Sequence, residues 1–150
     1  MTAPLFVDTN VLIYAHDVRA AERHDIAKAL ILELWRTQRG VLSTQVLQEF
    51  YVNLTRKIPS PLLRIDARRL IRQYSAWPVV TLDAAAVADA SELEEGQQIS
   101  FWDALIVVAA KRSGAAALLT EDLTSGQLLA GVRVINPFTD AGSLDAALRA

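Results

Sequence analysis

The sequence predicts an α/β fold with three layers, in which a short and mainly parallel sheet lies between two layers of helices. Short apolar runs of a few residues alternate with helical patterns from one end of the chain to the other, which is the pattern of a parallel sheet buried on both faces. No linker, low-complexity segment or internal repeat interrupts this alternation. Because 150 residues fit one domain, we expect a single domain over residues 1–150.

The strands are expected where apolar residues follow one another without helical periodicity. These runs lie at residues 5–7, 41–42, 79–82, 116–119 and 132–135. The helices are expected at residues 9–16, 20–38, 44–57, 60–76, 84–95, 100–113 and 143–149, with a further short helical piece between the last two strands.

Several helix starts are marked by capping residues. Ser43, Asp83 and Ser100 each precede a helical pattern, and serine and aspartate are favoured N-caps. Pro61 suits the first turn of the helix expected at 60–76. The run ALIVVAA at 104–110 is apolar on all faces, so its helix is expected to be central and buried.

The composition restricts the function. An apolar fraction of 52% and a charged fraction of 21% are typical of a globular protein. The absence of cysteine excludes disulfides, zinc–thiolate sites and cysteine nucleophiles. A net charge of −2 does not by itself indicate a nucleic-acid partner. The start of the chain lacks the basic region of a signal peptide, and no apolar run is long enough to span a membrane, so we expect a cytoplasmic protein.

Four carboxylates are the main indication of function. Asp8, Glu49, Asp103 and Asp122 each lie where an apolar run meets a polar or helical stretch. In parallel α/β sheets, ligands bind at the carboxyl ends of the strands, and both Asp8 and Asp122 lie just after a strand. Hard divalent cations prefer oxygen ligands. Together the four acids therefore predict one metal site that forms on folding.

Each acid also has an ordinary interpretation. Asp8 could be the N-cap of the next helix, and Asp103 could form a capping box with Ser100. Glu49 could be a solvated side chain, although it lies beside an apolar stripe. Asp122 could be a cap or a turn residue.

Neighbouring residues are expected to assist the acids. In an extended chain adjacent side chains point to opposite sides, so only one of Glu121 and Asp122 should face the site, and we expect it to be Asp122. Thr120 can hydrogen-bond a carboxylate or a bound water, and Asn10 offers a further oxygen.

In these motifs the chain resembles the PIN-domain family, and in particular the VapC-type toxins of bacterial toxin–antitoxin pairs. The resemblance covers nearly the whole chain, through FVDTNVLIYA at 6–15, STQVLQEFYVNLTRK at 43–57, ISFWDALIVVAA at 99–110, LLTEDLTSGQ at 118–127 and VRVINPF at 132–138. It implies a PIN-like fold and a metal-dependent ribonuclease that uses Mg²⁺ or Mn²⁺. It also implies an antitoxin protein as partner and a homodimer.

Position by position, the resemblance implies that Asp8, Glu49, Asp103 and Asp122 form the catalytic acidic cluster. Asp8, Asp103 and Asp122 are then the expected metal ligands, assisted by Thr120 or Asn10. A bound divalent cation lowers the pKa of a water ligand and stabilises charge on a phosphate. One ion or two would both satisfy this chemistry.

No histidine or lysine lies in these motifs as an obvious general base, and His16 and His24 are expected at the surface. Arg64, Arg68 and Arg72 are four residues apart, so they share one helix face that could contact RNA phosphates. The ordinary alternative is a solvated face paired with acids such as Asp66.

Other functions fit less well. An aspartyl-phosphate phosphatase of the haloacid-dehalogenase type would need an acid where this chain has Asn10, and a receiver domain would need an acid pair and a late lysine. A non-catalytic PIN-like module that binds RNA or protein is the main alternative. The RNA target and the cut site are left open by the sequence.

Overall fold

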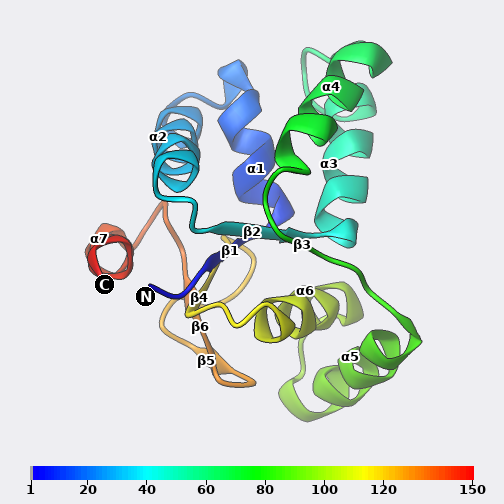
Figure 1. Ribbon diagram of the computed structural model, residues 1–150, viewed down its shortest axis with the longest axis vertical. Coiled ribbons are helices and arrows are strands. Elements are labelled where there is room, and N and C mark those ends of the chain that lie inside the picture. Colours follow the sequence, from blue (N-terminus) through cyan, green and yellow to red (C-terminus); the bar gives the residue numbers. More distant parts are fainter. Residues whose placement is uncertain (1) are drawn as a thin grey trace.

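A six-stranded sheet lies at the centre of the computed structural model, which describes residues 2–150. The strand order is β3-β2-β1-β4-β6-β5 (Figure 1). The strands are β1 (Leu5–Val7), β2 (Gly40–Ser43), β3 (Val79–Val80), β4 (Ala117–Leu119), β5 (Leu128–Leu129) and β6 (Val132–Ile135). All neighbouring strands pair in parallel except β5 and β6, which are antiparallel. The predicted α/β class with a mainly parallel sheet is confirmed.

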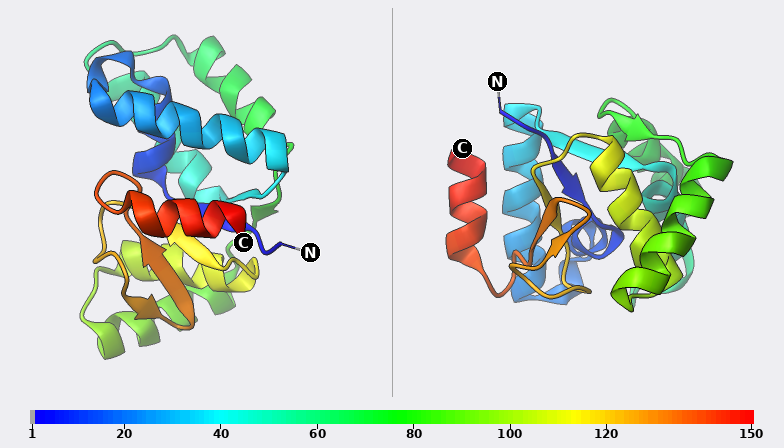
Figure 2. Two further views of the ribbon diagram at one scale, coloured as in Figure 1. Left: turned by 90° about the vertical axis from the view of Figure 1, so that its left-hand side faces the viewer. Right: turned by 90° about the horizontal axis from the view of Figure 1, so that it is seen from below.

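Helices cover both faces of the sheet. The helices are α1 (Thr9–His16), α2 (Glu22–Thr37), α3 (Thr44–Arg56), α4 (Arg64–Tyr74), α5 (Ala84–Gln97), α6 (Phe101–Arg112) and α7 (Ala141–Arg149), with a 3₁₀ turn at Val18–Ala20. Helices α1 to α4 lie together on one side and α5 and α6 on the other, while α7 lies beside α2 (Figures 1 and 2). Within residues 2–150, no helix has the length and apolarity needed to cross a bilayer.

The predicted capping residues start their helices as expected. The side-chain oxygens of Ser43, Asp83 and Ser100 each accept a backbone N–H three residues further on, at 3.3, 2.9 and 3.0 Å. Residues 104–110 of α6 are all buried, which confirms that this helix is central. Strand β1 and strand β4 are also fully buried.

The start of one predicted helix and the type of one predicted short element were wrong. The helix expected from residue 60 begins only at Arg64, because the preceding segment folds back on α3: the backbone N–H of Leu62 donates to the carbonyl of Leu54 at 2.8 Å, and Leu63 is extended. The short helical piece expected before the last strand is strand β5 instead. It forms a hairpin with β6 through Ala130 and Gly131, whose positive φ values of 50° and 84° are those of a type I′ turn.

The sheet register places the ends of β1 and β4 side by side. Val7 is paired with Leu119 in the parallel ladder, so the next residues, Asp8 and Thr120, leave the sheet at the same edge. The backbone N–H of Asp8 still donates to the carbonyl of Leu119 at 3.0 Å. The carboxyl end of the central strand pair therefore begins with an acid and a hydroxyl in contact.

A buried arginine joins the opposite edge of the sheet to the two ends of the chain. Arg39, directly before β2, is only 7% exposed. Its guanidinium donates to the carbonyl of Ala3 at 3.1 Å and to the carbonyls of Ala147 and Leu148, at the end of α7, at 2.9 and 3.0 Å. These carbonyls have no helical partner of their own, so Arg39 is a cap for α7.

We predict that Arg39→Met destabilises the protein by about 2–4 kcal/mol, because it leaves three part-buried carbonyls without the donors of a charged group. The free energy of unfolding in urea measures this loss. Arg36→Met is the matched control: Arg36 is exposed and pairs only with Glu33, so its loss should cost less than about 1 kcal/mol. Equal losses in the two variants would contradict the capping role of Arg39.

Candidate metal centre

Three of the four predicted acids meet at the carboxyl edge of the sheet. Carboxylate oxygens of Asp8, Asp103 and Asp122 all lie within 4.8 Å of one another. Asp8 follows β1, Asp103 lies in the first turn of α6, and Asp122 lies three residues beyond β4. Opposite ligands of a Mg²⁺ ion are about 4.2 Å apart, so shifts of less than about 1 Å would bring all three oxygens onto one ion.

Asp8 is the buried member of this group, with 4% of its surface exposed. Its Oδ1 accepts the backbone N–H of Thr9 at 2.7 Å, and its Oδ2 accepts the hydroxyl of Thr120 at 2.7 Å. Burial nevertheless raises the pKa of Asp8 to about 7, and the charges of Asp122 and Glu49 add to the effect. The two hydrogen bonds only partly offset the loss of hydration.

Thr120 connects the acids to one another. Its hydroxyl donates to Asp8 and accepts from the backbone N–H of Asp122 at 3.1 Å and from Nδ2 of Asn10 at 3.2 Å. A hydroxyl has one proton and two lone pairs, so all three hydrogen-bonding positions of the Thr120 hydroxyl are occupied. Asn10 also accepts the N–H of Glu121 at 3.4 Å. Both residues expected to assist the acids therefore contact them or their backbone.

Asp103 is half-buried, and its backbone N–H donates to Ser100. Ser100 therefore engages the backbone of Asp103 and also hydrogen-bonds its side chain, while a carboxylate oxygen of Asp103 still lies near those of Asp8 and Asp122. Burial raises the pKa of Asp103, and the neighbouring charges of Asp122 and Glu49 raise it further. Asp122 is the exposed member of the three.

Glu49 lies beside the three aspartates and is held by a different hydroxyl. Its Oε1 accepts from Oγ1 of Thr9 at 2.7 Å. It also lines an open groove of about 420 Å³ that passes Asp122. Asn53 and Lys57 also line this groove. They follow Glu49 at four-residue intervals, Asn53 on the same face of α3 and Lys57 directly after the end of that helix.

Glu121 points away from the acidic group. Its Oε1 accepts the hydroxyl of Tyr14 at 2.5 Å, and its Oε2 accepts Nε of Arg23 at 2.9 Å. Burial and the adjacent carboxylate raise the pKa of Tyr14 to about 12, so this phenol stays protonated and can donate. Of the two adjacent acids, Asp122 is the one that faces Asp8 and Asp103.

The three arginines expected to contact RNA lie exposed on α4, and none of them lines the groove beside Glu49 and Asp122. They are Arg64, Arg68 and Arg72. Among residues 2–150, no ion pair involves any of them, and Asp66 pairs with Arg69 at 3.5 Å instead. Pairing with Asp66 therefore does not explain the arginine face.

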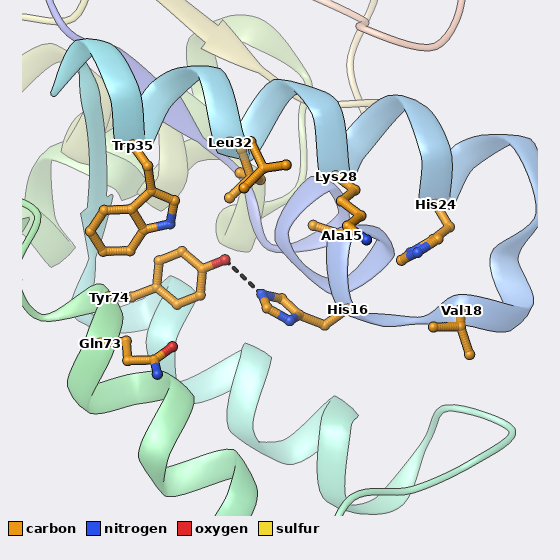
Figure 3. A pocket seen from close by; sticks show the side chains of 10 residues that line it. Ala15, His16, Val18, His24, Lys28, Leu32, Trp35, Gln73 and Tyr74 are labelled. Atoms are coloured by element: carbon orange, nitrogen blue, oxygen red, sulfur yellow. Dashed lines mark hydrogen bonds between the residues drawn. The ribbon is translucent and has the colours of Figure 1, made fainter.

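His16 does not lie free at the surface, contrary to expectation. It is half-buried, its Nε2 is 2.6 Å from the hydroxyl of Tyr74, and burial lowers its pKa to about 4. Figure 3 shows it in a pocket of about 470 Å³ between α1, α2 and α4. His24, on the rim, is half-buried and contacts the carbonyl of Tyr14. No carboxylate lines this pocket, so it does not offer the ligands of a hard cation.

Four residues that contact the acids or their neighbours were not predicted from the sequence. They are Thr9, Tyr14, Arg23 and Glu121, the last as the hydrogen-bond partner of Tyr14 and Arg23. Thr9 could have been noticed as a hydroxyl directly after Asp8. The other three had no local signal, because Tyr14 and Arg23 are 107 and 98 residues from Glu121 in the chain.

The donor set fits a hard divalent cation. It consists of carboxylate oxygens, and neither cysteine nor histidine belongs to it. Oxygen-only sites of this kind suit Mg²⁺ or Mn²⁺ better than Zn²⁺. Asp8 would be the anchor of such a site because its charge is already removed from water.

Comparison with known proteins identifies the family and the fold. The sequence model of the PIN domain matches residues 5–124. The fold is similar to that of VapC20 from Mycobacterium tuberculosis, a toxin that cleaves the sarcin–ricin loop, with a TM-score of 0.62 and 22% identity over 86% of this chain and 98% of that one. No curated protein sequence matches the chain.

Two further solved structures share the fold. A toxin–antitoxin complex from Klebsiella pneumoniae matches with a TM-score of 0.63 and 22% identity, over 90% of this chain and 98% of that one. VapBC2 of Rickettsia felis, bound to a DNA fragment from its promoter, matches with a TM-score of 0.62 and 17% identity, over 88% and 97%. The family model covers most of the chain and includes Asp8, Glu49, Asp103 and Asp122. The protein therefore belongs to the PIN-domain family.

Proposed function

We propose that this protein is a Mg²⁺- or Mn²⁺-dependent ribonuclease and the toxin of a bacterial toxin–antitoxin pair. The observation that carries the proposal is the convergence of Asp8, Asp103 and Asp122 within 4.8 Å at the carboxyl edge of the sheet. Membership of the PIN-domain family and the likeness in fold to VapC toxins support it.

In this proposal Asp8, Asp103 and Asp122 are the metal ligands, and all four acids are catalytic. The bound ion would lower the pKa of a water ligand and stabilise charge on the scissile phosphate. Glu49 is not within the group of three, but it lies close enough to raise the pKa of Asp8 and Asp103. Its carboxylate, fixed by Thr9, is suited to orient the attacking water.

The groove beside Asp122 is the proposed path of the RNA. Glu49, Asn53 and Lys57 span two helical turns, or about 12 Å, and Lys57 places a positive charge at the far end. Arg64, Arg68 and Arg72 on α4 would add phosphate contacts beyond the groove, because α4 packs against α3. The acids would be responsible for the chemistry and the basic residues for holding the strand.

An antitoxin protein is the proposed partner, and a homodimer the proposed assembly. The likeness to a toxin–antitoxin complex from Klebsiella pneumoniae supports the first. Both remain separate from the proposal of cleavage, which depends on the acids alone.

We predict that the protein cleaves RNA in the presence of Mg²⁺ or Mn²⁺ and that EDTA abolishes cleavage. Asp8→Asn should lower the cleavage rate at least about 100-fold. Asparagine caps a helix as well as aspartate does, so the variant should fold. The measurement is the cleavage of a mixed RNA pool followed on a gel, with Asp145→Asn, which changes an exposed acid on α7, as control. Metal-independent cleavage, or full activity in Asp8→Asn, would contradict the assignment. RNA binding without any cleavage would favour the non-catalytic module.

We predict that the metal-free protein loses stability as pH rises from about 4 to about 7. The folded-state pKa of Asp8 is raised to about 7 from 3.8, so folding favours the protonated form. The stabilising protonation is complete below about 4 and is lost as pH passes 7, at a cost of roughly 4 kcal/mol.

Urea unfolding of the wild type and of Asp8→Asn in EDTA, at pH 5 and pH 8, measures this difference. The wild type should lose stability relative to the variant between the two pH values. Added Mg²⁺ should restore it at pH 8, because the ion binds only the folded site. Parallel pH dependence of the two proteins would show that Asp8 is not the titrating group.

We predict that Arg68→Gln reduces the salt dependence of RNA binding. Each phosphate contact on a single strand contributes about 0.7 to the slope of log affinity against log salt. The binding is measured in the Asp8→Asn background at several salt concentrations. Arg149→Gln, an equal charge change at the exposed end of α7, is the control. An unchanged slope in Arg68→Gln would mean that α4 does not contact the phosphates.

A further inference from the structure

Asp122 is followed by a segment without regular secondary structure. Between the end of β4 and the start of β5, the chain forms only bends and turns. Asp122 is also the exposed member of the acidic group, so packing of its own side chain does not hold it. Its position depends on what fixes the backbone around it.

Two contacts fix this backbone: the hydroxyl of Thr120 accepts the N–H of Asp122 at 3.1 Å, and the side chain of the preceding residue, Glu121, is held by two donors. Glu121 accepts the hydroxyl of Tyr14, from α1, at 2.5 Å and Nε of Arg23, from α2, at 2.9 Å. Its backbone N–H donates to Asn10 at 3.4 Å. Both carboxylate oxygens of Glu121 therefore have a donor, one from each helix.

The donors are themselves held in place. The ring of Tyr14 packs edge-on against that of Phe138, which follows β6, with centroids 5.3 Å apart. The guanidinium of Arg23 lies over both rings, at 5.9 Å from the centroid of Tyr14 and 5.4 Å from that of Phe138. Side chains from α1, α2 and the segment after β6 thus support the carboxylate of Glu121.

The pairing also keeps a fifth carboxylate out of the acidic group. Asp8, Asp103, Asp122 and Glu49 already repel one another in the absence of metal. Glu121 is next to Asp122 in the chain, and freed from its donors it could turn toward the same site. Its ion pair with Arg23 balances that charge, and the bond to Tyr14 fixes its direction.

We propose that Tyr14 and Arg23 are positioning residues, which hold Glu121 away from the acidic group and thereby fix Asp122 as the third metal ligand. The inference rests on the proposed metal-dependent function. Tyr14 should have the larger effect: its bond to Glu121 is partly buried, whereas Arg23 is 48% exposed and an exposed ion pair is weak alone.

The test is the affinity of the purified protein for Mn²⁺, measured by calorimetry at pH 8. Removal of a partner that orients a metal ligand typically weakens binding about 10- to 100-fold. We expect Tyr14→Phe to raise the Mn²⁺ dissociation constant about tenfold. Tyr51→Phe is the matched control, since Tyr51 is a half-buried tyrosine of α3 and is not among the residues that hydrogen-bond Glu121.

A double-mutant cycle separates positioning from general damage. If Tyr14 acts through Asp122, Tyr14→Phe should have no further effect on Mn²⁺ affinity in the Asp122→Asn background. Arg23→Gln should weaken binding and Arg23→Lys should recover part of the loss, because lysine keeps the charge. Additive losses in the cycle, or equal affinities of the two Arg23 variants, would overturn the inference.

The outcomes distinguish the two levels of the proposal. If wild-type protein binds Mn²⁺ and Asp122→Asn weakens it, but Tyr14→Phe binds as wild type does, the positioning role is wrong and the metal site stands. If wild-type protein does not bind Mn²⁺, the proposed function is wrong, and the positioning role falls with it.

Discussion

The buried carboxylate of Asp8 is the constraint on which the site depends. It leaves the sheet beside Thr120 because β1 and β4 pair in register, and it is 4% exposed. One oxygen caps α1 and the other accepts Thr120, yet its pKa stays well above that of a free aspartate. In this position the carboxylate must either be neutralised by a proton or have its negative charge balanced by a bound cation. The capping and metal-binding interpretations of Asp8 are therefore compatible, since the capping hydrogen bond does not balance the negative charge of the carboxylate.

Most of the fold could be predicted because it depends on local pattern. Apolar runs gave the strands, and caps such as Ser43 and Ser100 placed the helix starts. The exceptions were decided by contacts between distant segments or by weak turn signals. Leu62 folds back on α3 and delays the start of α4. The turn at Ala130 and Gly131 contains only one glycine, and its alanine adopts a positive φ that the residue type does not suggest.

The acids of the candidate site could be found because they lie at strand ends and helix starts, where parallel topology brings residues together. Their supporting contacts could not be found in this way. Tyr14 and Arg23 reach Glu121 across about a hundred residues, and nothing near either residue marks it. His16 was misjudged for the same reason: its partner Tyr74 is 58 residues away. Ligands follow from topology, whereas their orientation depends on side chains that only the folded structure brings together.

The most direct test is the position of the ion itself. Crystals grown with Mn²⁺ should show an anomalous peak with carboxylate oxygens of Asp8, Asp103 and Asp122 within about 2.2 Å of it. Glu49 should approach the ion directly or through a water. A peak at another place on the molecule, or no peak at the acidic group at saturating Mn²⁺, would contradict the claim that these carboxylates form a metal centre.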